Sequence, residues 1–218
     1  MQGAGAPAVG DNGAMTLGKG RFESFSDGVF AIAITLLILE IHLPPTVSRA
    51  SGSSAQAKAL LEIWPAYLVY VASFATIGIM WLNHHALFDA AQRITHGVIV
   101  ANLVLLGLIS FLPFTTEVLG RLGLTQATVV YYGLTMTAIA FAYLGVQIQV
   151  IAAHPGSAQK LTRWNIVGMT AYPLATVVGF FVPLLGVVLI ALLAVFYALP
   201  RNVRVARFTP GPNVDAVR

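Results

Sequence analysis

The chain has 218 residues, of which 57% are apolar and 9% charged, with a formal net charge of +4 and no cysteine. Soluble domains average about 45–50% apolar and about 25% charged residues, so this composition indicates an integral membrane protein. The missing cysteines exclude disulfides, thiolate catalysis and cysteine metal ligands. The basic residues are scattered between apolar segments, which favours the charge rule for cytoplasmic loops over nucleic-acid binding.

Apolar segments divide the chain into three regions. Residues 1–19 lack the basic start and apolar core of a signal peptide and are predicted to be a disordered cytoplasmic tail. Residues 20–200 form a predicted six-helix membrane domain, and residues 201–218 a basic cytoplasmic tail against anionic lipid headgroups. At about 20 residues per span, the predicted spans are Ser24–Leu43, Ile63–Ala86, Val98–Val118, Thr128–Ala152, Asn165–Val182 and Leu184–Leu199.

Two features set the limits of these spans. The last two come from one apolar stretch that Pro183 interrupts, and its length suits a tight hairpin of two short helices. The segment Pro44–Ala59 contains Pro-Pro and Ser-Gly-Ser-Ser, so it is predicted to be a loop outside the membrane.

Lysine and arginine predict the orientation. With a cytoplasmic N-terminus, nine of these residues fall on the cytoplasmic side: Lys19, Arg21, Arg93, Lys160, Arg163, Arg201, Arg204, Arg207 and Arg218. Three fall on the other side, namely Arg49, Lys58 and Arg121. The excess predicts that both termini are cytoplasmic, which requires an even number of spans.

The polar residues of the spans do not form an enzyme motif. The chain lacks His-Glu-x-x-His, Gly-x-Ser-x-Gly, a phosphate loop and paired intramembrane aspartates. His84 and His85 are adjacent, whereas helical metal ligands usually lie three or four residues apart, so a metal site is not expected. The stretch Thr176–Phe181, "TVVGFF", superficially resembles a carbonyl filter, but its continuous apolar surroundings leave no room for a re-entrant loop.

Several polar residues lie towards the predicted cytoplasmic half of the first three spans: Ser26, Asp27, Trp81, Asn83, His84, His85 and Asn102. Such groups are costly in a membrane and normally pair inside the protein. They are interpreted as a hydrogen-bonded clamp between helices, with a proton relay as the alternative. Ser24 followed by Asp27 also fits a helix-start capping pattern.

The first span has two different faces. At about 100° per residue, with Ile32 at zero, Leu36 lies near +40°, Leu39 near −20° and Thr35 near −60°. Asp27 and Ser26 lie near −140° and +120°, on the opposite face. The helix is therefore predicted to present an aliphatic stripe on one side and its polar groups to the second and third spans on the other.

The motif Arg-x-x-x-Phe-Ser-Asp, formed by Arg21, Phe25, Ser26 and Asp27 before an Ile/Leu/Thr-rich helix, resembles the signature of the transmembrane protein 175 family of endosomal and lysosomal potassium channels. "MWLNHHALFD" (80–89) and "ANLVLLGLISFLPFTTEVLG" (101–120) are similar to its second and third spans. The resemblance covers about the first 120 residues.

The resemblance implies an all-α channel of the bacterial single-repeat type: six helices per subunit, a homotetramer, and the first helix lining a central pore without a Gly-Tyr-Gly filter. It implies a potassium-over-sodium cation channel in the cell membrane of a bacterium, without a cofactor, that admits potassium, rubidium or caesium. Rings of Ile32, Leu36 and Leu39 would form the gate, and Arg21 and Phe25 would belong to the clamp. Thr35 corresponds to a threonine associated with selectivity, although its hydroxyl could instead bond to a helix carbonyl.

Two other interpretations stay open. A proton-coupled carrier or exchanger would use His84, His85 and Asp27 as titrating groups, and a membrane scaffold would conduct nothing. Carriers usually show internal symmetry and interrupted helices, which this sequence does not display, so the channel is favoured.

Overall fold

The computed structural model describes residues 18–45, 47–48, 52–89, 91, 93–153 and 163–198. These residues form helices and no strand. In chain order the helices are α1 (Lys19–Leu36), the 3₁₀-helix η1 (Leu37–Glu40), α2 (Ser53–Glu62), α3 (Trp64–Asp89), α4 (His96–Leu122), α5 (Gln126–Ala153), α6 (Arg163–Phe181) and α7 (Pro183–Ala198). Both predicted tails lie largely outside the described residues.

Six of these helices correspond to the six predicted spans. Within the described residues, Lys19–Glu40, α4 and α5 are long and apolar enough to cross a membrane, and α6 and α7 contain shorter apolar runs. The helix α3 adds a further 26 residues, which include no lysine or arginine and, apart from the last residue Asp89, no acidic residue. The all-helical membrane architecture predicted from the sequence is therefore present.

The first helix differs from its predicted bounds at both ends. It begins at Lys19, with Gly18 as N-cap, so Ser24 lies inside the helix and the capping interpretation of Ser24 and Asp27 is wrong. It changes to the 3₁₀-helix η1 at Leu37, and Ile41 is extended, with φ −84° and ψ 107°. Proline disfavours helical backbone in the residue before it, so the Pro-Pro pair at 44–45 explains why the helix stops short of Leu43.

The helix α2 was not predicted. Part of the presumed loop Pro44–Ala59 is helical because the run "AQAKALLE" after Ser53–Ser54 consists largely of residues that favour helix. The Ser-Gly-Ser-Ser sequence marks only the start of this helix, whose N-cap is Gly52.

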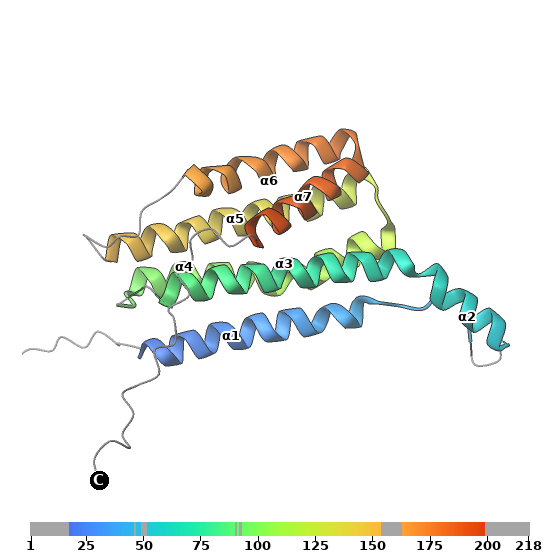
Figure 1. Cartoon of the computed structure of the whole chain (residues 1–218), viewed down its shortest axis with the longest axis horizontal. Helices are drawn as coiled ribbons and strands as arrows, with labels where there is room; N and C mark the ends of the chain where they lie inside the picture. The colour runs from blue at the N-terminus through green and yellow to red at the C-terminus, as the bar shows by residue number, and fades with distance from the viewer. Residues whose placement is uncertain are drawn as a thin grey trace, which may run out of the picture.

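The long helices lie side by side in a bundle, with α1 at one edge and α6 and α7 at the other (Figure 1). The helix α1 packs against α3 and α4, while α5 connects α4 to the α6–α7 pair. One face of α1 is buried by these neighbours, through Phe22, Ser26, Phe30 and Ala33. Its opposite face is not covered by the described part of the chain.

The helices α6 and α7 form the predicted hairpin, in which Val182 separates Phe181 from Pro183. Their backbones meet closely where Gly186 of α7 contacts Gly179 of α6, and a Cβ on Gly186 would collide with the Gly179 backbone. Glycine is required here because it has no side chain and not because of an unusual backbone conformation, since both glycines have ordinary helical φ.

We expect Gly186→Ala to destabilise the protein, because the added methyl group would push α6 and α7 apart. Overpacking of this kind costs about 1–3 kcal/mol, measurable as a lower midpoint of thermal unfolding in detergent. The matched control is Gly120→Ala in α4, where a Cβ would meet no atom within 4 Å. An equal midpoint for both variants would contradict the close packing of the hairpin.

Candidate functional site: the first helix and its polar clamp

The exposed face of α1 carries the predicted aliphatic stripe. Ile32 is 61% exposed and Leu39 is 64% exposed, and Leu36 is also exposed. Leu39 lies in η1 rather than in the α-helix, yet it remains on the uncovered side. The structure thus places the three predicted gate residues on one open surface.

The buried face of α1 is joined to α3 and α4 by a chain of hydrogen bonds. Ser26 Oγ donates to the Phe22 carbonyl at 3.1 Å and accepts from Asn102 Nδ2 at 3.0 Å. Asn102 Oδ1 lies 2.8 Å from His84 Nε2. Because Ser26 has one hydrogen and gives it to a carbonyl, the direction of the chain is set: His84 Nε2 carries the proton and donates to Asn102.

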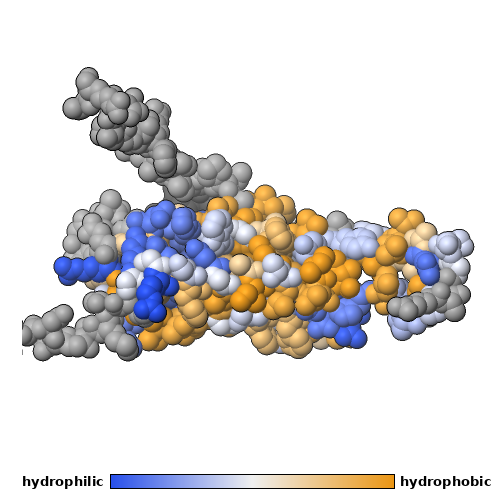
Figure 2. Space-filling view, turned by 90° about the horizontal axis from the view of Figure 1, so that it is seen from below, coloured by the Kyte–Doolittle hydropathy of each residue, from blue (hydrophilic) through white to orange (hydrophobic). Residues whose placement is uncertain are grey.

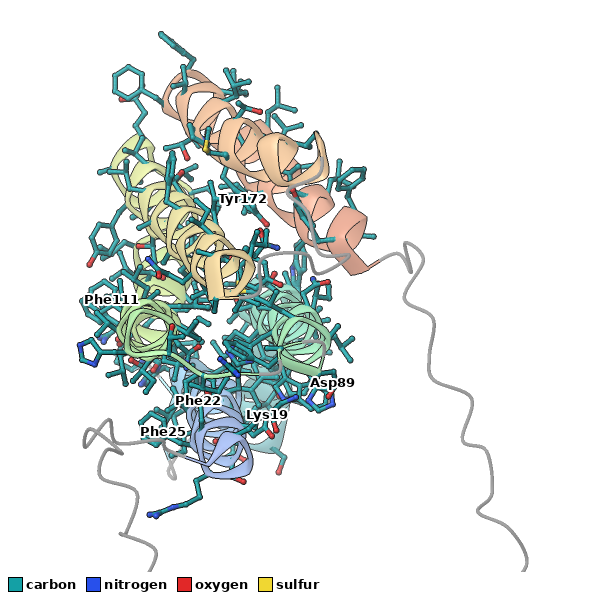
Figure 3. All side chains as sticks on the ribbon, turned by 90° about the vertical axis from the view of Figure 1, so that its left-hand side faces the viewer. Lys19, Phe22, Phe25, Asp89, Phe111 and Tyr172 are labelled. Carbon is teal, nitrogen blue, oxygen red and sulfur yellow. The ribbon has the colours of Figure 1, made fainter. Side chains whose placement is uncertain are left out.

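His84, at one end of this chain, is buried among aromatic rings. Its ring centroid lies 5.2 Å from that of Phe30 and 4.6 Å from that of Phe88. Phe22 reaches the same place, 4.9 Å from Phe88, and points from α1 into the bundle (Figure 3). Polar pairing and aromatic packing therefore hold α1, α3 and α4 together at one level.

A second connection links Asp27 to α3. Trp81 Nε1 donates to Asp27 Oδ1 at 2.8 Å. The Trp81 ring stacks on His85 with 5.6 Å between centroids, and His85 Nε2 lies 3.6 Å from Asp89 Oδ2. The predicted orientation of Asp27 and Ser26 away from Ile32 is therefore confirmed, and both act between helices in this structure.

The remaining predicted clamp residues lie elsewhere. Asn83 faces α5 and α7. Its side-chain amide donates to the Tyr197 carbonyl at 3.4 Å, and its backbone carbonyl accepts from the Tyr143 hydroxyl at 2.9 Å. Arg21 is exposed. Phe25 is also exposed and points outward (Figure 3). The structure of one chain therefore brings together Ser26, Asp27, Trp81, His84, His85 and Asn102 but neither Arg21 nor Phe25.

Thr35 lies on the exposed side of α1. Its hydroxyl donates back to the carbonyls of Ala31 and Ile32, at 2.9 Å each. The hydroxyl hydrogen is therefore engaged within the helix, and the oxygen lone pairs are what Thr35 offers to its surroundings.

A second set of buried polar residues was missed from the sequence. Thr116 donates to the Leu112 carbonyl at 2.9 Å, and Ser73 lies 3.0 Å from Thr116. Tyr132 of α5 also interacts with Ser73, so polar side chains of α3, α4 and α5 meet at this level. Serine, threonine and tyrosine are ordinary in membrane spans, and no spacing within one helix signals a contact among α3, α4 and α5.

Known proteins are similar to this chain over most of its length. The family model "Endosomal/lysosomal potassium channel TMEM175" matches residues 21–113. A protein of Chamaesiphon minutus named potassium channel is 37% identical over 195 residues, covering 84% of this chain and 95% of the relative. Human TMEM175, named an endosomal/lysosomal proton channel, is 40% identical over 105 residues, covering 46% of this chain and 21% of that protein.

A solved structure shows the same fold. The crystal structure of a lysosomal potassium-selective channel TMEM175 homologue from Chamaesiphon minutus superposes with a TM-score of 0.71 at 34% identity, covering 83% of this chain and 96% of that one. These relatives are ion channels and not enzymes. The identity and coverage show that this multi-pass membrane protein belongs to the TMEM175 family of ion channels.

Proposed function

We propose that the chain forms a homotetrameric cation channel in a lipid bilayer that selects potassium over sodium, with α1 lining the central pore. The main observation in support of this proposal is the uncovered face of α1. Its other face is anchored by a buried polar network, whereas Ile32, Leu36 and Leu39 contact nothing that would bury them within the described chain. The Chamaesiphon relatives are named potassium channel and potassium-selective channel, which supports the choice of ion.

The gate is formed by apolar rings rather than by a carbonyl filter. Four copies of Ile32, together with Leu36 and Leu39, narrow the axis, and a narrow apolar ring excludes water and therefore ions. Rotation or spreading of the four α1 helices would widen the rings and admit the ion. The clamp on the opposite face, through Ser26 and Asp27, ties α1 to α3 and α4, so the three helices would move together.

Thr35 provides a polar group on the same face of α1. Both roles considered for it are compatible, because back-bonding uses the hydroxyl hydrogen and leaves the oxygen as an acceptor. A ring of four such oxygens replaces part of the hydration shell of potassium, rubidium or caesium. One ring offers few ligands, so we expect weaker selectivity than in carbonyl-filter channels.

Thr35→Val is expected to lower the potassium-to-sodium permeability ratio, because valine has nearly the shape of threonine and lacks its oxygen. Thr35→Ser retains the oxygen and should keep most of the ratio. Reversal potentials of reconstituted channels under potassium and sodium gradients measure this difference. An unchanged ratio in the valine variant would remove Thr35 from the ion path.

The experiment that tests the function is a liposome flux assay comparing potassium, rubidium, caesium and sodium. A channel of the proposed kind passes the first three faster than sodium, down their gradients. Absence of flux in vesicles that hold folded protein would support a scaffold instead.

The cellular setting is also proposed. We place the channel in the cell membrane of a bacterium with both termini in the cytoplasm, supported by the nine-to-three distribution of basic residues. Arg201, Arg204, Arg207 and Arg218 of the C-terminal tail, outside the described residues, would contact anionic headgroups.

Proton movement is the second candidate, because human TMEM175 is named a proton channel. In a proton-coupled carrier or exchanger, His84, His85 and Asp27 would titrate. Saturable flux that depends steeply on an imposed proton gradient would support this function, whereas flux independent of that gradient supports the channel.

A further inference from the structure

The C-terminal end of α1 tightens into the 3₁₀-helix η1. A 3₁₀-helix has three residues per turn, so side chains three residues apart eclipse one another. Leu39 therefore lies over Leu36, and both are exposed on the uncovered side. Glu40 in the same way lies over Leu37, which is fully buried against the bundle. The tight turn thus keeps two leucines on the open face and directs Glu40 towards the neighbouring helices.

An α-helix over the same residues would place Leu39 differently. At 100° per residue Leu39 would lie about 60° around the axis from Leu36, and about 1.5 Å closer to it along the axis, than in a 3₁₀-helix. Seen from the α1 side, apolar surface runs along the middle of the molecule (Figure 2). The type of helix at η1 therefore decides whether Leu36 and Leu39 stand in one line on this surface.

Glu40 joins η1 to α4. Its carboxyl group interacts with that of Glu117, and the charges of Arg121 and His42 also act on it. Arg121 Nη1 forms an ion pair with Glu117 Oε1 at 2.8 Å. Two carboxyl groups repel one another unless a proton lies between them, so this pair is stable as one carboxyl group and one carboxylate. The backbone carbonyl of Glu40 is also engaged, 2.9 Å from His42 Nδ1.

We propose that Glu40 is a positioning residue of the gate: through its contact with α4 it holds η1 as a 3₁₀ turn and keeps Leu39 in line with Leu36. This inference rests on the proposed function, since it assigns to Glu40 the support of one apolar ring. Without the contact, η1 relaxes to an α-helix, because leucine and glutamate favour that form. Leu39 then turns away from Leu36, and the apolar barrier becomes one ring shorter.

The test measures potassium flux from loaded liposomes, normalised to the amount of folded protein. Glu40→Leu removes the contact and is expected to raise the flux several-fold. Glu117→Leu removes the partner group from α4 and should give a similar rise. Glu40→Gln can still donate to Glu117 and should show most of this rise suppressed. The matched control is Glu62→Leu, which removes an exposed carboxylate of α2 away from η1 and should leave the flux unchanged.

A double variant shows whether Glu40 acts through Leu39. Leu39→Ala is expected to raise the flux by itself, because it narrows the apolar ring less. Adding Glu40→Leu should then change the flux little, since both substitutions remove the same ring from the barrier. An equal fold increase from Glu40→Leu in both backgrounds would show that Glu40 acts elsewhere and would overturn its positioning role.

The outcomes separate this inference from the proposed function. If Leu39→Ala raises the flux while Glu40→Leu and Glu117→Leu do not, the gate stands and the role of Glu40 is wrong. A rise in Glu62→Leu as large as that in Glu40→Leu would assign the effect to surface charge and also overturn the role of Glu40. Folded protein that passes no potassium, with or without Leu39→Ala, overturns both the channel and this inference.

Discussion

Replacing Ile32 by asparagine is expected to raise potassium flux through the reconstituted protein several-fold. Ile32 is the first of the three predicted gate residues along α1 and is 61% exposed in one chain. Four asparagines in a ring would hold water where four isoleucines exclude it, so the barrier from dewetting falls. Flux from potassium-loaded liposomes, normalised to the amount of folded protein, measures the effect.

Two controls make this result specific. Ile32→Leu keeps the ring apolar and should leave the flux near its original value. Leu134→Asn introduces the same amide at an exposed position of α5, away from α1, and should not raise flux. An Ile32→Asn variant with unchanged flux would remove this residue from the gate, while a rise in both asparagine variants would point to general leakage.

Replacing Asn102 by leucine is expected to give the largest loss of stability. Asn102 is buried and is the only residue of the described chain seen to bond to both Ser26 and His84. Leucine has a similar volume, so the packing survives while two buried polar groups lose their partner. Each group left unpaired costs about 1–3 kcal/mol, less where other helices can replace the bond, since interhelical hydrogen bonds in membranes average about 0.6 kcal/mol.

Thermal unfolding of the purified protein and the yield of assembled channel report this loss. Asp27→Asn is the matched control, because its side-chain oxygen can still accept from Trp81 Nε1 and should cost less. The double variant Ser26→Ala with Asn102→Leu tests the coupling: the two losses should not add, since they break the same bond. Full additivity would show that Ser26 and Asn102 contribute independently.

Much of the fold follows from residues near one another in the chain. Long apolar runs predict the six spans because a membrane requires each helix to satisfy its own backbone. Helical geometry alone placed Ser26 and Asp27 opposite Ile32, and the structure confirms this separation. The segment of 3₁₀-helix at Leu37–Glu40 was not predicted, because hydropathy does not distinguish it from the end of the α-helix. The helix α2 was not predicted either, because the prolines and the Ser-Gly-Ser-Ser sequence were given more weight than the helix-favouring run that follows them.

The sequence by itself determined that the protein crosses a membrane, where its spans lie, and which side of α1 is polar, since hydropathy and the helical period are local properties. Only the tertiary structure decided which polar groups meet. In the structure, Ser26, Asn102 and His84 form one chain of hydrogen bonds, whereas Asn83 bonds to α7. Arg21 and Phe25 lie outside this network. The physical reason is that hydrogen bonds between helices depend on their rotation and depth relative to one another, which residues distant in the chain set together.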